Sequence, residues 1–216
     1  FVSESTKKIV EKILEIKDIG RLKYNVLNPL PSISRILLTK ANSINQNFNT
    51  KNKFILFNSS IVPRKNLDSL IFDFLSSNLP KEGYKLYVAG KIHTNDYCNY
   101  IQEITKDHNS IHLLDYVNEI DKSWLYLNAE AFVSTSSTEG FGIPALDACS
   151  LGMPALLSDI PSHSEIYKKF DKSKQIKLIP NNSEDWIENL NLLVDEHTKS
   201  DKKENRLKCF QSNIKY

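Results

Sequence analysis

The stretch AFVSTSSTEGFGIPALDACSLGMPALLSD, residues 131–159, decides the fold. Two short apolar runs, AFVSTS (131–136) and PALLSD (154–159), enclose a helical segment around PALDACSLG (144–152). Apolar runs of this length are typical of strands that are buried on both faces of a parallel sheet. The stretch therefore predicts a strand–helix–strand unit, with the EGFG loop (139–142) at the carboxyl end of its first strand.

The same alternation continues on both sides of this unit. Four more strand-length runs are FILFN (54–58), KLYVAG (85–90), IHLLDYV (111–117) and QIKLI (175–179). Helical segments lie between and after the strands, at 66–78, 96–108, 121–129, 163–170 and 183–197. We therefore expect an α/β fold, a doubly wound Rossmann-like parallel sheet of about six strands with helices on both faces. Ligands bind at the carboxyl ends of the strands in such sheets.

The N-terminal quarter has a different character. Ser3 or Ser5 can cap a first helix that ends near Gly20, and the polar stretch 40–53 predicts a linker or exposed loop. Residues 1–53 carry ten Lys or Arg against four Asp or Glu. A solvated helix face accounts for this excess, and contact with an anionic membrane surface is the alternative.

Composition excludes several classes of protein. A net charge of +2 over 216 residues, without interleaved basic and aromatic residues, does not indicate nucleic-acid binding. Cys98, Cys149 and Cys209 show no C-x-x-C spacing, so we expect no disulfide framework, no zinc site and a reducing, cytoplasmic compartment. The histidines lack metal-ligand spacing and are interpreted as surface or helix-start residues. The opening FVSES has neither an initiator Met nor a signal-peptide pattern, from which we expect a piece of a longer chain.

The first candidate site is the loop NSSIVPRKN (58–66). It contains neither the G-x-G-x-x-G pattern of dinucleotide-binding domains nor a P-loop. Instead, Arg64 and Lys65 lead into a helix, and two cations beside a helix N-terminus suit a diphosphate. Taken alone, two solvated surface cations would be the favoured interpretation.

The second candidate site is the EGFG loop with the helix that follows it. Its glycines let a ligand approach the backbone closely, and the Glu139 carboxylate beside exposed amides suits sugar hydroxyls and phosphate oxygens. Pro144 opens the helix and Asp147 lies within it. A capped helix start with an acidic first turn is the alternative.

A third candidate is Asp115-Tyr116-Val117, at the end of a predicted strand. An aromatic ring with exposed backbone can hold a nucleobase, although a strand end with a half-buried Tyr is the simpler interpretation. Gly90 also follows a strand, where it permits close backbone approach or a turn.

Together these segments resemble the C-terminal domain of retaining glycosyltransferases of the group-1 or family-4 type, one half of a GT-B architecture. The resemblance is clear from Phe54 to about Val194. The stretch STSSTEGFGIPALDACSLGMPALLSDIPSHSEI (134–166) looks like the family's P-S-x-x-E-G-F-G-x-P-x-x-E-A-x-A-x-G-x-P-V motif. VPRKN (62–66) is similar to its lysine motif.

The resemblance implies a role for each matching position. Arg64 and Lys65 would bind the leaving diphosphate, Glu139 and the loop backbone the sugar, Asp147 the ribose diol, and Tyr116 and Val117 the base. The implied catalytic residues are Arg64, Lys65 and Glu139. The implied donor-binding residues are Ser59, Ser60, Gly90, Tyr116, Val117, Gly140, Phe141, Gly142, Ile143 and Asp147.

Four positions depart from the family pattern. Asp147 stands where the family normally has Glu, and Ser59-Ser60 stands where Gly-Arg is commoner. Asp115 occupies a position that is often Gly. These departures concern the binding of the sugar nucleotide and not the fold.

The resemblance also implies a domain organisation. Residues 1–53 would be an interdomain helix and connecting segment, 54–198 the donor-binding domain and 199–216 a C-terminal helical tail. A missing N-terminal domain would supply the acceptor site.

The implied function is transfer of a sugar from a nucleotide-diphosphate sugar, with retention of configuration and without metal or cofactor. It would serve polysaccharide, lipopolysaccharide or other glycoconjugate biosynthesis, in the cytoplasm or at the inner face of the membrane. The alternatives are a non-catalytic binding module of the same fold and half of a nucleotide-sugar epimerase.

Overall fold

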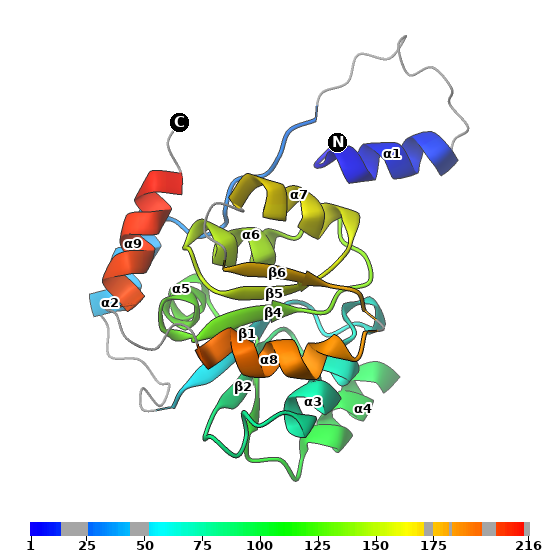
Figure 1. Cartoon of the computed structure of the whole chain (residues 1–216), viewed down its shortest axis with the longest axis vertical. Helices are drawn as coiled ribbons and strands as arrows, with labels where there is room; N and C mark the ends of the chain where they lie inside the picture. Colours follow the sequence, from blue (N-terminus) through cyan, green and yellow to red (C-terminus); the bar gives the residue numbers. More distant parts are fainter. Residues whose placement is uncertain (14–25, 44–51, 171–174, 182, 196–201, 214–216) are drawn as a thin grey trace.

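The computed structural model describes residues 1–13, 26–43, 52–170, 175–181, 183–195 and 202–213. Its centre is a sheet of six parallel strands in the order β3-β2-β1-β4-β5-β6 (Figure 1). The strands are β1 (Phe54–Asn58), β2 (Lys85–Ala89), β3 (Ile111–Asp115), β4 (Ala131–Ser134), β5 (Ala155–Ser158) and β6 (Ile176–Ile179). Each begins and ends within two residues of the predicted bounds, so the predicted sheet is confirmed.

Helices cover both faces of the sheet, as predicted (Figure 1). One face carries α3 (Leu67–Ser76), α4 (Asp96–Thr105) and α8 (Asp185–Asp195). The other carries α5 (Glu119–Asn128), α6 (Ile143–Ser150) and α7 (Pro161–Phe170). Along β1, Ile55 and Phe57 belong to the first core and Phe54 and Leu56 to the second, because successive side chains of a strand point to opposite faces.

The order in which the chain adds strands to the sheet reverses at β1. The chain moves outward from β1 through β2 to β3, then returns to the other side of β1 with β4. Connections on the two sides of such a point diverge and leave a crevice at the carboxyl ends of the strands. The loops that follow β1 and β4 border this crevice, and both were singled out from the sequence.

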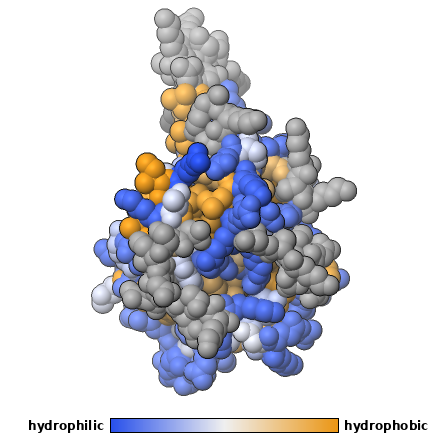
Figure 2. Space-filling model, turned by 90° about the vertical axis from the view of Figure 1, so that its left-hand side faces the viewer, coloured by the Kyte–Doolittle hydropathy of each residue, from blue (hydrophilic) through white to orange (hydrophobic). Residues whose placement is uncertain are grey.

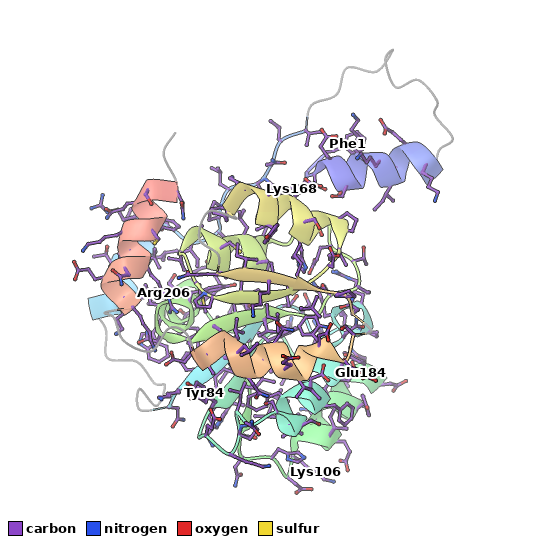
Figure 3. All side chains as sticks on the ribbon, viewed as in Figure 1. Phe1, Tyr84, Lys106, Lys168, Glu184 and Arg206 are labelled. Atoms are coloured by element: carbon purple, nitrogen blue, oxygen red, sulfur yellow. The ribbon has the colours of Figure 1, made fainter. Side chains whose placement is uncertain are left out.

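The N-terminal helix α1 (Glu4–Ile13) lies beside α7 (Figure 1). Ser3 caps it, because the Ser3 hydroxyl accepts a hydrogen bond from Thr6 N at 3.0 Å. Ser5 N donates to Glu165 of α7 at 2.8 Å. Phe1 stands at the start of this helix, on the side of the molecule where α7 carries Lys168 (Figure 3). The predicted helix end at Gly20 lies outside the described residues.

Helix α2 (Arg35–Ser43) corrects the predicted linker, whose first residues, 40–43, are helical. Leu38 and Ala41 lie three residues apart and are fully buried in the core that also contains Trp124 of α5. Burial of this one face therefore stabilises the helix. The polar residues around Leu38 and Ala41 hid the helical pattern in the sequence. Residues 44–51 of the predicted linker lie outside the described ranges.

Helix α9 (Lys202–Asn213) closes the described chain against α5 (Figure 3). The buried Arg206 guanidinium donates to the carbonyls of Tyr126, Leu127 and Ala129 at 2.7–2.8 Å. It thereby bonds carbonyl groups that a helix C-terminus leaves without an internal partner.

The side on which α2 and α9 lie is largely hydrophilic, with an apolar area in its upper part (Figure 2). None of the described helices is both long and apolar enough to cross a membrane.

Candidate functional site

Hydrogen bonds join the loops that follow β1 and β4. Asn66 Nδ2 donates to the Thr135 carbonyl at 3.0 Å, and the Thr135 hydroxyl donates to the Lys65 carbonyl at 2.9 Å. Ser137 N donates to the Arg64 carbonyl at 2.8 Å. Asn66 has a positive φ of 47° at the end of a short 3₁₀ helix (Pro63–Lys65), a conformation that Asn tolerates better than most residues. The two loops thus form one rigid border of the crevice.

Within this border, the buried ammonium of Lys65 is paired with the Glu139 carboxylate. The Ser136 hydroxyl also donates to Glu139 Oε1, at 2.8 Å. Burial raises the pKa of Glu139, but the hydrogen bond and charge of Lys65 outweigh it and bring the pKa below its usual value. Burial lowers the pKa of Lys65, and the same hydrogen bond and charge oppose that shift. The two side chains form an ion pair, so a ligand that enters the cavity can take the place of either partner: an anion can bind Lys65, and a hydroxyl can donate to Glu139.

Arg64 lies differently from its neighbour. Its side chain is 48% exposed, and its Nη1 donates to the Thr138 carbonyl at 3.0 Å and lies 3.5 Å from Glu139 Oε2. Arg64 therefore supports the loop after β4 from outside. The sequence predicted two cations side by side at an anion site, and the structure buries Lys65 and leaves Arg64 at the rim.

Two adjoining cavities occupy the crevice. The Lys65 cavity, about 370 Å³, is lined by Val2, Pro29, Ser59, Ser60, Lys65, Glu139, Phe141, Gly142, Ile143 and Pro144. The Asp147 cavity, about 380 Å³, is lined by Ser32, Asn58, Ser59, Ser60, Ala89, Gly90, Lys91, Tyr116, Val117, Glu119, Lys122, Ile143, Pro144 and Asp147. Both volumes fall in the range of small-molecule sites. Every predicted site residue except Arg64 and Gly140 lines one of them.

Two glycines are required by the shape of the crevice. A Cβ on Gly90 would lie 1.9 Å from the Ser59 carbonyl oxygen, so no other residue fits where β1 and β2 end side by side. Gly142 has a φ of 93° and immediately precedes α6. A Cβ there would meet the His163 ring at 3.3 Å, in addition to the strain of the left-handed backbone.

The far wall of the Asp147 cavity comes from the loop after β3. The Tyr116 side chain is 73% exposed there, which leaves its ring free to stack on a flat ligand. Asp115 adopts a φ of 56°, which explains why the related pattern often has Gly at this position. The Asp115 carboxylate accepts from Ile92 N at 2.8 Å, which stabilises the loop after β2.

Asp147 lies in α6 and is 1% exposed. Ser32 N donates to its Oδ1 at 2.6 Å, and the Ser32 hydroxyl donates to its Oδ2 at 2.5 Å. Burial raises the pKa of this carboxyl to about 6, although the bonds from Ser32 act in the opposite direction. The group predicted to bind a ribose diol is thus already bonded within the chain.

Several residues of the site carried no recognisable signal in the sequence. Val2 and Pro29 line the Lys65 cavity, and Ser32 lines the Asp147 cavity. The hydroxyls of Ser3 and Thr6 donate to the Gly140 carbonyl at 2.8 and 2.9 Å. Nothing in the sequence pattern connects this N-terminal segment with loops more than a hundred residues away.

The expectation that the histidines lie at the surface or at helix starts is wrong for His112, which is half-buried within β3, but it holds for His163. His163 stands in the first turn of α7, where it is fully buried under Gly142. Its Nδ1 lies 2.9 Å from the Ser158 carbonyl, so this nitrogen carries the proton. Nε2 has no hydrogen-bond partner among the described residues. Burial lowers the pKa of His163, which keeps the ring neutral beneath the loop.

No group of three His, Cys, Asp or Glu within the described part of the chain is arranged to hold a metal ion. The described side chains of the crevice include one buried cation–carboxylate pair, a second buried carboxylate and an exposed aromatic ring.

The sequence has relatives among curated proteins. The O-antigen chain mannosyltransferase B of Escherichia coli is 32% identical over 117 residues, which cover 52% of this chain and 30% of the relative. The O-antigen chain mannosyltransferase RfbU of Salmonella typhimurium is 29% identical over 155 residues, 70% of this chain and 42% of the relative. The chain thus spans less than half the length of these relatives.

Solved structures share the fold. A glycosyltransferase from Rickettsia africae superimposes with a TM-score of 0.73 at 15% identity, covering 99% of this chain and 57% of that structure. WaaG, a glycosyltransferase involved in lipopolysaccharide biosynthesis, gives 0.58 at 19% identity, covering 85% and 47%. The model of the family described as "Glycosyl transferases group 1" matches residues 39–209, which include both loops of the crevice. The chain therefore belongs to the group 1 glycosyl transferase family.

Proposed function

We propose that this chain is the sugar-nucleotide-binding half of a retaining glycosyltransferase of GT-B architecture. The observation that carries the proposal is the buried Lys65–Glu139 pair at the crevice of a doubly wound sheet. A fixed ammonium stabilises the negative charge that develops on a diphosphate as the sugar leaves. A carboxylate beside it accepts hydrogen bonds from sugar hydroxyls.

The two cavities suggest how the substrate lies. The Lys65 cavity would take the sugar and the diphosphate, and the adjoining Asp147 cavity the nucleoside. Ser59 and Ser60 line both cavities and would therefore lie beside the diphosphate. The exposed ring of Tyr116 would stack on the base, and Asp147 would accept bonds from the ribose diol.

The chemical step would proceed without a metal ion. The bond between the anomeric carbon and the diphosphate oxygen breaks, and an acceptor hydroxyl forms a new bond to that carbon on the same face. The leaving phosphate takes the proton of the acceptor. Lys65 would hold the leaving oxygens, while Arg64 at the rim would act mainly through Glu139 and Thr138.

The acceptor site would lie on a second domain. The relatives are more than twice the length that this chain matches, and residues 1–53 are too few to form a domain of the usual size. Leu27, Leu30 and Ile36 are 58–75% exposed on the segment that leads into the sheet domain, as expected of a surface that contacts another domain. The two mannosyltransferases are named for O-antigen chains, which supports a role in glycan biosynthesis. We propose that this role is carried out in the cytoplasm or at the inner face of the membrane.

Calorimetric titration with UDP, GDP and their sugars, followed by a transfer assay, tests the proposal. We expect this chain alone to bind a nucleoside diphosphate weakly and to transfer nothing, whereas the complete protein transfers. Robust transfer by this chain alone would overturn the assignment as half an enzyme. The absence of binding to any nucleotide or sugar nucleotide would overturn the assignment of the site.

A non-catalytic module that binds sugar nucleotides is the second candidate. It is favoured by one observation, that Asp147 is bonded to Ser32. A complete protein that binds a sugar nucleotide, yet neither transfers nor hydrolyses it with a range of glycan acceptors, would favour this candidate. Epimerase activity is not favoured, because the family match and both relatives are transferases.

A further inference from the structure

Residues 26–34, which we name the connecting segment, precede α2 and border the crevice at Ser32. Pro29 of this segment lines the Lys65 cavity, and Ser32 lines the Asp147 cavity. The segment therefore borders both halves of the proposed substrate site, although it precedes the first strand of the sheet by about twenty residues. The segment is attached to the sheet domain by the side chain of Ile33, which is buried in the core, and by hydrogen bonds to the Asp147 carboxylate.

Both oxygens of that carboxylate are engaged. Oδ1 accepts from Ser32 N at 2.6 Å and from Ile33 N at 3.4 Å, and Oδ2 accepts from the Ser32 hydroxyl at 2.5 Å. The Ser32 hydroxyl in turn accepts from Lys122 Nζ at 3.2 Å, and Lys122 is also bonded to Glu119. We name the bonds between Ser32, Ile33 and Asp147 the Ser32 clasp.

The clasp has the hydrogen-bonding pattern of a bound diol. A ribose offers two adjacent hydroxyls, and a carboxylate binds them by accepting one hydrogen bond at each oxygen. Ser32 supplies the same two donors, one to each oxygen, from its backbone and its side chain. Asp147 is 1% exposed, so no face of the carboxylate remains open for a second pair of strong donors.

The length of the acidic side chain supports this interpretation. Asp is one methylene shorter than Glu and reaches less far from α6 into the cavity. In this chain the shorter carboxylate meets a serine that comes toward it from the connecting segment. The Asp at this position and the Ser at 32 are therefore complementary parts of one contact.

We propose that Ser32 and the ribose of the nucleotide compete for Asp147, so that nucleotide binding releases the connecting segment. This inference rests on the proposed function, because it requires a nucleotide in the Asp147 cavity. Nucleotide binding and release of the clasp are thermodynamically linked. A change that stabilises the closed clasp by a given factor therefore lowers the affinity for the nucleotide by the same factor. The clasp thus couples occupancy of the crevice to the position of Ser32 and Pro29, which border the two cavities.

The affinity of hydroxyl variants tests the competition. UDP, GDP and ADP are titrated at pH 7.5 into the wild type, Ser32→Ala and Ser34→Ala. We expect Ser32→Ala to bind the preferred nucleotide roughly fivefold more tightly, the equivalent of one hydrogen bond of about 1 kcal/mol. Ser34→Ala is the matched control, because the Ser34 hydroxyl accepts from Leu37 N at the start of α2 and is not bonded to Asp147. Its affinity should not change.

Hydrogen exchange at the amides of Ser32 and Ile33 gives an independent measurement. Both amides donate to Asp147, so a saturating nucleotide should accelerate their exchange in the wild type. Unchanged or slower exchange in a demonstrated complex would overturn the inference and leave the proposed function intact. Equal or weaker binding by Ser32→Ala would do the same. Failure of every variant to bind any of the three nucleotides would overturn the proposed function, and the inference with it.

Discussion

The ammonium of Lys65 is paired with the carboxylate of Glu139, which lies 74 residues further along the chain. The two side chains are only 5% and 10% exposed, so each depends on the other for its charge to be tolerated. Breaking a buried pair by removing one member is costly, because the remaining charge loses its partner. We expect Lys65→Met or Glu139→Gln alone to lower the free energy of unfolding by about 3 kcal/mol.

The double variant Lys65→Met/Glu139→Gln distinguishes this pairing from independent packing effects. It removes both charges together, so its loss of stability should be clearly smaller than the sum of the two single losses. Urea denaturation of the four proteins at pH 7.5 measures the coupling. Strictly additive losses would contradict an interaction between the two side chains.

The different placement of Lys65 and Arg64 predicts different effects on ligand binding. Lys65→Ala should weaken the binding of UDP by about 1.5–3 kcal/mol, the contribution of a hydrogen bond to a charged group, and leave the binding of uridine nearly unchanged. Arg64→Ala should cost less than half as much, because its side chain is 48% exposed and bonded to Thr138. Calorimetry with UDP and uridine on both variants makes the comparison, with Lys106→Ala as an exposed control. Equal losses for UDP and uridine would argue against a diphosphate at Lys65.

Local pattern was enough to predict the sheet and the border of the crevice. Buried parallel strands appear as uninterrupted apolar runs, and the residues that follow them must meet at one edge of the sheet. For that reason the loops that contain Gly90, Tyr116 and Glu139 were expected at one site, and the family resemblance added Ser59. All four residues line its cavities. The roles proposed for them remain predictions.

Contacts between distant segments could not be predicted in this way. Ser32 has no periodicity or motif that connects it with Asp147, and their bond depends on how a linker crosses the sheet domain. Arg206 occurs in a polar helix and gives no sign in the sequence that it bonds the last carbonyls of α5. His163 resembles any helix-start histidine until the fold places Gly142 above it. Each of these contacts depends on tertiary structure rather than on local propensity.

Gly90 should tolerate no larger residue. In Gly90→Ala the new Cβ would lie 1.9 Å from the Ser59 carbonyl, so the ends of β1 and β2 must separate and the crevice must deform. We expect a stability loss of several kcal/mol, comparable with overpacking in a core, together with loss of nucleotide binding. Gly83→Ala is the matched control: Gly83 has a φ of 85° but open space around it, so only backbone strain of about 1–2 kcal/mol should appear. Thermal unfolding that ranks Gly83→Ala as the more harmful change would contradict this account.

The buried Asp147 carboxyl should give the protein a distinctive dependence of stability on pH. Its pKa is raised from 3.8 to about 6 in the folded protein, so the folded state holds this proton more tightly than the unfolded state does. The contribution of the protonated group to stability is therefore fully present below about pH 4 and is lost as the pH rises through 6. Across that window the free energy of unfolding should fall by about 3 kcal/mol on account of this group alone.

Asp147→Asn isolates that contribution, because the amide keeps the shape of the protonated acid and does not titrate. The difference between wild type and variant in the free energy of unfolding should decline between pH 4 and 6 and be constant above 7, measured by urea denaturation at half-unit steps. In Ser32→Ala the hydroxyl bond that lowers the pKa of Asp147 is absent, so the decline should end at a higher pH. A difference that stays constant from pH 4 to 7 would mean that the carboxyl titrates in the same range folded and unfolded, and that the clasp does not bury it.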